Sequence, residues 1–299
     1  MVAAKPIGII DALASGFTVV HRRLGLLLIP VIADFLYWTG PRITAAAPLS
    51  SVLEAPSAGP APIVGFDPLG LNLMALLSFH LPSLARAPSL SSLPMFSPWL
   101  LLRIELTSWP MLLIAVLALG ALGLLLASLY LQLLAGPIRG EDSRLTARSF
   151  EHLPQRTRAL AGALLIVLGL TTSVGAILLA VSERSAMNLL PAFGLWVALL
   201  FFFVDAAIFV GGLGAIAALR QSISLVWRQF WPCLGIFAAL QVISVGLPLF
   251  WARLPGNFLN QPWGALIAIP THLYLLSGLT AGVMGFYKSR VAALAPARI

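Results

Sequence analysis

The sequence contains few charged residues. Only 9% of its 299 residues are charged, whereas 60% are hydrophobic. Because a soluble globular domain carries roughly 25% charged residues, this composition excludes a water-soluble protein. The apolar residues instead form runs of the length that crosses a bilayer, which is about 20 residues per helix. We therefore expect one polytopic membrane domain over residues 1–299.

Cysteine and lysine are also scarce. Cys233 is the only cysteine, which excludes an intramolecular disulfide, a thiolate metal site and a CxxC redox pair. The two lysines, Lys5 and Lys288, belong to no GxxxxGK[ST] loop, so an ATP-driven pump in this chain alone is excluded. The four histidines are scattered and no HExxH occurs. We expect no metal and no cofactor.

Six apolar runs predict six transmembrane helices. They lack the alternating pattern of barrel strands, and in lipid each segment must pair its backbone groups internally, which favours helices. The runs are 24–40, 109–135, 159–181, 189–214, 231–251 and 264–287. The Pro-rich segment 41–108 is expected as an extracytoplasmic loop. Its apolar stretch 69–84 is interrupted and too short to span, so we expect it on the outer leaflet or capping the bundle.

The basic residues predict the orientation. Thirteen of the 18 Lys and Arg fall on the side that carries both termini, and five on the other. The positive-inside rule then places both termini in the cytoplasm, in a bacterial inner membrane. The net charge of +8 indicates anionic lipid headgroups rather than nucleic acid, because the basic residues stand at the ends of apolar runs.

Short amphipathic segments precede three of the runs. The apolar pattern of 13–24, ahead of the first run, recurs in 219–230 ahead of the fifth, and 147–158 is a weaker counterpart ahead of the third. We therefore expect three hairpins, each introduced by a short cytoplasmic interfacial helix with its apolar stripe in lipid. Chance self-alignment of apolar sequence is the alternative. The expected interfacial lipid contacts are Arg22, Arg23, Arg228, Trp227 and Trp231.

One of these lead-in segments carries a family resemblance. Residues 218–231, with the sequence ALRQSISLVWRQFW, continue into Leu234-Gly235-Ile236-Phe237. This element resembles the helix-then-span unit of uncharacterised bacterial six-span membrane proteins. It is similar to that of the membrane domain fused to some glycerophosphodiester phosphodiesterases. We expect no phosphodiesterase activity, because the chain leaves no room for the soluble barrel of those enzymes.

Polar residues inside the apolar runs are the candidate functional positions, because such groups are costly in lipid. Asp34, Gln241 and His272 could form one polar cluster, and Asp205 lies in the inner third of the fourth run. One interpretation makes Asp34 and His272 a proton or cation relay, and the other makes each a hydrogen-bonded clamp. We favour the clamp, because one Asp and one His are fewer than most ion pathways contain.

Small residues at a spacing of four predict close helix packing. Gly123 with Ala127, and Gly278 with Gly282, let helix backbones approach each other. We expect packing within the chain, and a partner protein is the alternative. The stretch 211–214 follows no predicted strand, so we interpret its glycines as packing or helix-termination positions rather than a dinucleotide loop.

These observations favour a non-catalytic membrane scaffold or accessory subunit that contacts lipid and other membrane subunits or a second copy. The alternative is a small-molecule, lipid or ion permease that uses Asp34, His272 and Gln241. A membrane enzyme comes third, because Ser277 and His272 lie on different faces of one predicted helix and leave the nucleophile without a positioned base.

Overall fold

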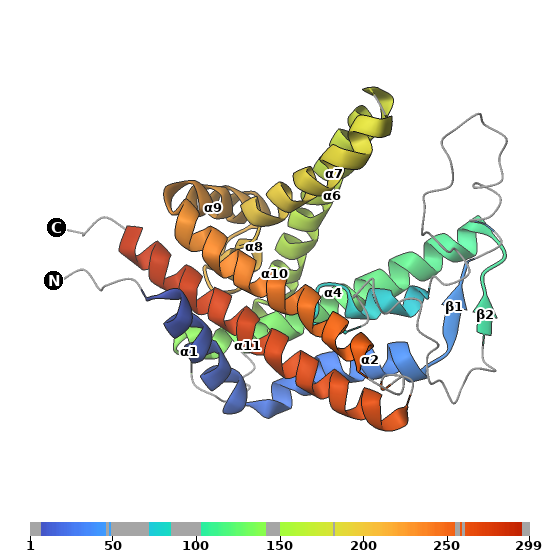
Figure 1. Cartoon of the computed structure of the whole chain (residues 1–299), viewed down its shortest axis with the longest axis horizontal. Helices are drawn as coiled ribbons and strands as arrows, with labels where there is room; N and C mark the ends of the chain where they lie inside the picture. The colour runs from blue at the N-terminus through green and yellow to red at the C-terminus, as the bar shows by residue number, and fades with distance from the viewer. Residues whose placement is uncertain are drawn as a thin grey trace. The chain divides into compact units, whose positions relative to one another are not determined.

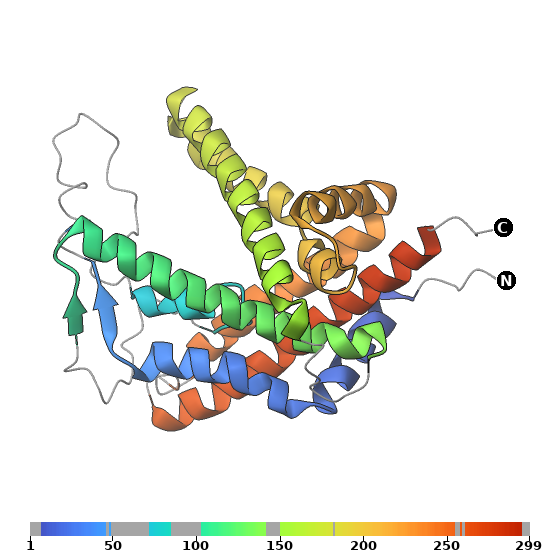
Figure 2. The same cartoon turned by 180° about the vertical axis from the view of Figure 1, so that it is seen from behind.

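The structure is a computed structural model in which two compact units are distinguished. It describes residues 7–45, 48, 72–84, 103–141, 150–181, 183–254, 258 and 261–294. Unit 1 comprises Met1–Leu26, Leu131–Ile243 and Leu275–Ile299, and unit 2 comprises Leu27–Tyr130 and Ser244–Tyr274. Figures 1 and 2 show the elements of both units from opposite sides.

Long apolar helices dominate the described residues. They are α4 (Trp109–Arg139), α6 (Leu153–Val181), α7 (Glu183–Leu200) followed by α8 (Val204–Phe209), α10 (Phe230–Arg253) and α11 (Pro262–Leu294). With α7 and α8 taken together, five of the described segments are long and apolar enough to cross a membrane. The chain is therefore helical and membrane-like, as the composition predicts.

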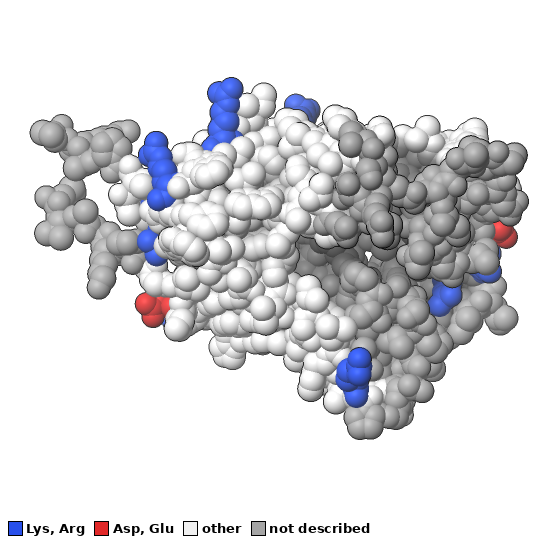
Figure 3. Space-filling view, turned by 45° about the horizontal axis from the view of Figure 1, so that its top comes forward, with Lys and Arg blue, Asp and Glu red and all other residues white. Residues whose placement is uncertain are grey.

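The surface of these helices is apolar. Ile114 of α4 is 67% exposed and Leu165 of α6 is 68% exposed. The face in Figure 3 shows few charged side chains among the described residues. Apolar surface of this extent is unfavourable in water and is matched by lipid tails, so the fold indicates a multi-pass membrane protein.

The first predicted span is the shortest helical segment of the six. It consists of the 3₁₀-helix η1 (Leu24–Leu27) and α2 (Leu28–Thr39), and α2 has 12 residues. Rises of about 1.5 Å per α-helical residue and about 2 Å per 3₁₀ residue give roughly 26 Å in total, against a hydrocarbon core of about 30 Å. This segment is not among the five long helices.

Unit 1 contains both short amphipathic helices, α1 (Ile9–His21) and α9 (Ala215–Arg228). A Cβ on Gly282 of α11 would lie 2.9 Å from Cα of Leu13, so α1 is in backbone contact with α11. The apolar stripe of α9 packs against α6, α7 and α8, with Leu219 and Val226 buried. Part of each stripe therefore packs on neighbouring helices within the protein, which the sequence pattern did not predict, while Leu24 of the first stripe stays 53% exposed.

The helix boundaries follow the sequence repeat at two of its three positions. The amphipathic helices begin at Ile9 in α1 and at Ala215 in α9, and the helices after them begin at Leu24 in η1 and at Phe230 in α10. Ile9 and Ala215 are therefore separated by the same number of residues as Leu24 and Phe230, and this separation is the one between the two copies of the apolar pattern. The third lead-in differs, because α6 begins at Leu153 and residues 153–158 form its first turns rather than a separate helix.

Unit 2 has a core of aromatic and aliphatic side chains from α2, η2 (Leu73–Ser78), α10 and α11. Next to it, β1 (Arg42–Thr44) pairs in parallel with β2 (Arg103–Glu105), with Ile43 opposite Ile104. Residues 72–84, one of the described parts of the predicted loop, pack into this unit, with Leu77 and Leu81 buried. This segment was expected on the outer leaflet or capping the bundle, and in the structure its leucines pack beside α2.

Candidate functional site

Asp34 lies at the centre of a buried polar cluster in unit 2. Its side chain is 0% exposed. Oδ1 accepts hydrogen bonds from Oγ of Ser78 at 3.1 Å and from Oγ of Ser83 at 2.5 Å. Oδ2 accepts one from the backbone N–H of Leu84 at 2.7 Å. All three donors come from one segment, so the carboxylate fastens residues 78–84 to α2.

The fold of residues 72–84 explains how Ser78 and Ser83 reach the same oxygen. Oδ1 of Asn72 accepts a hydrogen bond from the N–H of Met74 at 3.2 Å, which starts η2. His80 then has φ +67°, a left-handed conformation that reverses the chain between the two serines. The 3₁₀-helix η2 followed by this reversal places the hydroxyl groups of Ser78 and Ser83 on the side of the segment that faces Asp34.

His272 of α11 contacts the same segment. It is 1% exposed and hydrogen-bonds to the backbone of Ser83, whose hydroxyl group binds Asp34. Asp34 and His272 are therefore linked through Ser83. Gln241 lies in the part of α10 that belongs to unit 1. The structure thus brings together two of the three residues of the predicted cluster.

Gly123 of α4 and its neighbour Ala127 are packing positions in unit 2. A Cβ on Gly123 would lie 2.0 Å from the backbone oxygen of Leu76 in η2. Ala127 is 0% exposed. The small residue therefore admits the 3₁₀-helix η2 against α4, which is close packing within the chain as expected.

Gly278 and Gly282 of α11 are packing positions in unit 1. A Cβ on Gly16 of α1 would lie 2.2 Å from the oxygen of Gly278 and 2.3 Å from the nitrogen of Gly282. The GxxxG surface is occupied by α1 of the same chain, which is the expected packing within the chain.

Asp205 lies beside a break in the fourth predicted span. It stands half-buried in the first turn of α8, after a turn at 201–203 that separates α7 from α8. Ser222 of α9 bridges the break: its hydroxyl group donates to the oxygen of Leu200 at 2.7 Å and accepts from the N–H of Phe203 at 3.1 Å. A serine thus satisfies backbone groups that the break frees, as membrane helices require.

The predicted interfacial residues lie on the surface of unit 1. Trp227 is 67% exposed and Trp231 is 77% exposed. Arg22 and Arg228 are exposed, and Arg23 is half-buried. Aromatic and basic side chains in such positions fit the headgroup region of a bilayer.

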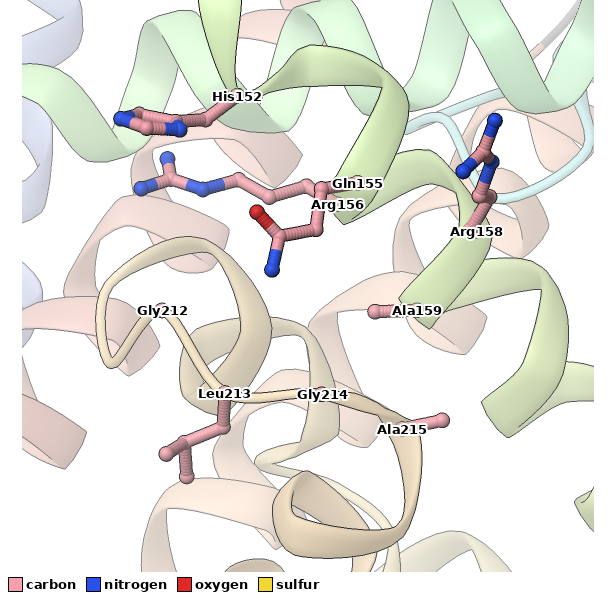
Figure 4. Close-up of a pocket in the computed structure, with 9 residues that line it drawn as sticks. All are labelled: His152, Gln155, Arg156, Arg158, Ala159, Gly212, Leu213, Gly214 and Ala215. Atoms are coloured by element: carbon pink, nitrogen blue, oxygen red, sulfur yellow. The ribbon is translucent and has the colours of Figure 1, made fainter.

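A basic cavity of about 500 Å³ opens in unit 1. In Figure 4, His152, Gln155 and Arg156 gather on one side of it, the loop 212–214 bounds the other side, and Arg158 stands apart. Arg156 is half-buried and donates to the side-chain oxygen of Gln132. The second wall ends in Gly214 and Ala215, where α9 begins.

Glu141, whose charge acts on Arg156 and His152, is paired with Arg139. Its two carboxylate oxygens accept hydrogen bonds from Arg139 at 2.5 and 2.6 Å. That hydrogen bonding holds the pKa of Glu141 below its usual range, and the charges of Arg156 and His152 add to the effect. Glu141 is therefore ionised at neutral pH, and most of its charge is balanced by Arg139.

Sequence reasoning missed the partners of Asp34 and the cavity. Ser78 and Ser83 are distant from Asp34 in the sequence, in a segment without helical periodicity. The cavity residues come from two separate stretches, one of them expected only to terminate a helix. A cluster of Arg156, Arg158 and His152 at the start of an apolar run is the one signal in the sequence that could have indicated an anion site.

The described residues contain no group of three or more His, Cys, Asp or Glu side chains that could hold a metal ion. No family model matches the chain, and no curated protein and no solved structure matches it either.

Proposed function

We propose that this chain is a non-catalytic integral membrane scaffold or accessory subunit of a membrane assembly. It would cross a bacterial inner membrane six times, as three hairpins with both termini in the cytoplasm, and contact anionic lipid and other membrane subunits or a second copy. The resemblance of residues 218–237 to uncharacterised six-span proteins belongs to the same proposal.

The observation that carries the proposal is the burial of Asp34. Its 0% exposed carboxylate accepts hydrogen bonds from three donors of one segment of the same unit. A transported proton or cation needs a group with water access and a second conformation. A carboxylate with fixed donors on both oxygens instead holds two chain segments together, which favours a structural role.

The permease remains the second candidate because of His272. Its Nδ1 atom is buried and has no hydrogen-bond partner among the described residues. A buried imidazole nitrogen with spare hydrogen-bonding capacity beside an Asp-Ser cluster is a feature that proton-conducting proteins also use.

The variant Asp34→Asn separates the two functions. The asparagine keeps one side-chain oxygen as acceptor for Ser78 and Ser83. Its amide NH₂ group then faces the N–H of Leu84, and a buried donor without an acceptor lowers the free energy of unfolding by about 1–3 kcal/mol. We expect a lower thermal stability in detergent and unchanged proton and cation flux in reconstituted vesicles. Asp11→Asn is the matched control, because Asp11 is exposed on α1 and the chemical change is the same.

The two outcomes exclude each other. A folded Asp34→Asn protein that loses a flux shown by the wild-type chain would contradict the scaffold and favour the permease. Purification of the native complex in mild detergent tests the scaffold directly, because a stoichiometric membrane partner should co-purify with the chain.

A further inference from the structure

The basic cavity of unit 1 has the chemistry of a phosphate site. Its lining includes Arg156, Gln155 and His152, which gather on one wall in Figure 4. A guanidinium group binds phosphate through two parallel N–H donors, and an amide adds a neutral donor. The half-buried Arg156 is held by Gln132 through one of its NH₂ groups, which orients the guanidinium group and leaves its other donors for a ligand.

The opposite wall adds positive potential. Gly214 is the N-cap residue of the 14-residue helix α9 and has no side chain with which to cap the first turn. The N-terminal end of a helix carries a partial positive charge and binds anions. Gly214 and Ala215 both line the cavity, so this end of α9 borders the same space as Arg156.

The charged side chains that line the cavity are positive. Arg156 and Arg158 line it, and Glu141, which acts on Arg156 and His152, is paired with Arg139. Arg139 also donates to the backbone oxygen of Phe209, which fixes the ion pair to the end of α8. The charge of Arg156 is therefore left for a ligand.

The position of the cavity along the helices matches headgroup depth. Arg156 and Arg158 lie in the first turns of α6, directly before a stretch with a mean hydropathy of 2.1, and Arg139 is the last residue of α4. Phosphate groups of lipids occupy this boundary between apolar core and water. The cavity is also within the size range of small-ligand sites, about 300–1,000 Å³.

We propose that the cavity formed by His152, Gln155, Arg156 and the start of α9 at Gly214 and Ala215 binds a phosphate group. The group belongs either to the headgroup of an anionic phospholipid or to a free phosphate in the cytoplasm. This site is separate from the Asp34 cluster and does not depend on whether the chain is a scaffold or a permease.

Equilibrium binding to the full chain tests this site. The chain is placed in phosphatidylcholine nanodiscs and titrated with radiolabelled short-chain phosphatidylglycerol in one arm and radiolabelled inorganic phosphate in the other. Binding of phosphatidylglycerol alone identifies a lipid headgroup site, and binding of inorganic phosphate identifies a site for the free anion. Affinity in the arm that binds should fall with rising salt, because salt screens charge interactions that solvent reaches.

Three variants locate the site. Arg156→Gln removes the charge, and Gln155→Glu adds an opposing carboxylate without touching the hydrogen bond to Gln132. Each should weaken binding about tenfold or more, because Arg156→Gln removes a charge-assisted hydrogen bond and Gln155→Glu places a negative charge beside the bound anion. Glu141→Gln should strengthen binding, because it removes the neighbouring negative charge.

Arg220→Gln is the matched control. It removes the same charge from an exposed position on α9 outside the cavity lining, and should leave affinity unchanged. Unaltered affinity in both Arg156→Gln and Gln155→Glu would overturn the proposal. So would equal losses in Arg156→Gln and Arg220→Gln, which would indicate a diffuse charge effect. Because Gln155 is exposed, its variant keeps the test valid if Arg156→Gln fails to fold.

Discussion

At the scale of single residues, the polar positions in apolar runs were visible in the sequence and their partners were not. Asp34 and His272 stand out because ionisable residues are rare in lipid-facing helices. Ser78 and Ser83 do not, since serine is common in loops. Their role follows only from the left-handed turn at His80 that brings them to one carboxylate oxygen.

The glycines of the α1 and α11 contact lead to a prediction for single residues. Gly16→Ala should destabilise the contact, because its Cβ would lie 2.2 Å from the backbone oxygen of Gly278, and backbone atoms can yield only by separating the helices. Such overpacking costs about 1–3 kcal/mol. Limited proteolysis of the N-terminal region and thermal unfolding in detergent measure the effect.

Gly246→Ala, in another helix, is the control for replacing a helical glycine by alanine. Gly246 is exposed in α10, and nothing lies within 4 Å of the position that a Cβ would take there. Replacing glycine by alanine at this position should stabilise the helix by up to about 1 kcal/mol. If Gly16→Ala were as stable and as protease-resistant as Gly246→Ala, the described contact between α1 and α11 would be incorrect.

At the scale of elements, hydropathy identified the long helices and could not find the break between α7 and α8. Residues 201–203 are all phenylalanine, so the apolar run continues across the turn. The break depends instead on Ser222, which lies further along the chain on α9 and supplies a donor and an acceptor. The strands β1 and β2 were likewise missed, because three-residue strands show no alternation to detect.

Ser222→Ala tests the support of this break. The change removes both hydrogen bonds and leaves the oxygen of Leu200 and the N–H of Phe203 without this partner, which should cost about 1–3 kcal/mol. Hydrogen exchange should accelerate at Phe203, and the thermal unfolding temperature should fall. Ser224→Ala, on the same helix, is the matched control and should change neither quantity.

The exchange rate at Phe203 distinguishes a role of Ser222 in hydrogen bonding from a role in packing. If exchange at Phe203 stayed slow while stability fell, the serine would act through packing alone. The hydrogen bonds across the break would then not be its main contribution.

At the scale of the whole molecule, composition and charge could predict a helical membrane protein but not its packing. The predicted amphipathic helices α1 and α9 exist at the two matching positions of the sequence repeat. Part of each stripe nevertheless packs on protein, since amphipathicity does not distinguish lipid from a neighbouring helix. The cavity could not be predicted because its two walls, 152–159 and 212–215, come from separate segments of the chain.

The orientation proposed for the chain is tested by cysteine labelling from outside the cell. The test positions Ser57, Asn257, Ser149 and Ala297 lie outside the described residues. With both termini in the cytoplasm and six spans, single cysteines at positions 57 and 257 should react with a membrane-impermeant maleimide. Those at positions 149 and 297 should react only after the membrane is permeabilised, because the positive-inside rule keeps the arginine-rich loop in the cytoplasm.

Cys233 makes the background of this experiment low, since the only native cysteine is buried and Cys233→Ala removes it.

The short segment Leu24–Thr39 decides whether the number of membrane crossings is even or odd. If it does not cross the membrane, the N-terminus moves to the side of position 57, and a cysteine at Ala3 will react from outside together with one at position 57. If it crosses, the cysteine at Ala3 stays protected while position 57 reacts. Labelling at position 149 with protection at position 57 would reverse the orientation, and labelling at both would require a further crossing between them.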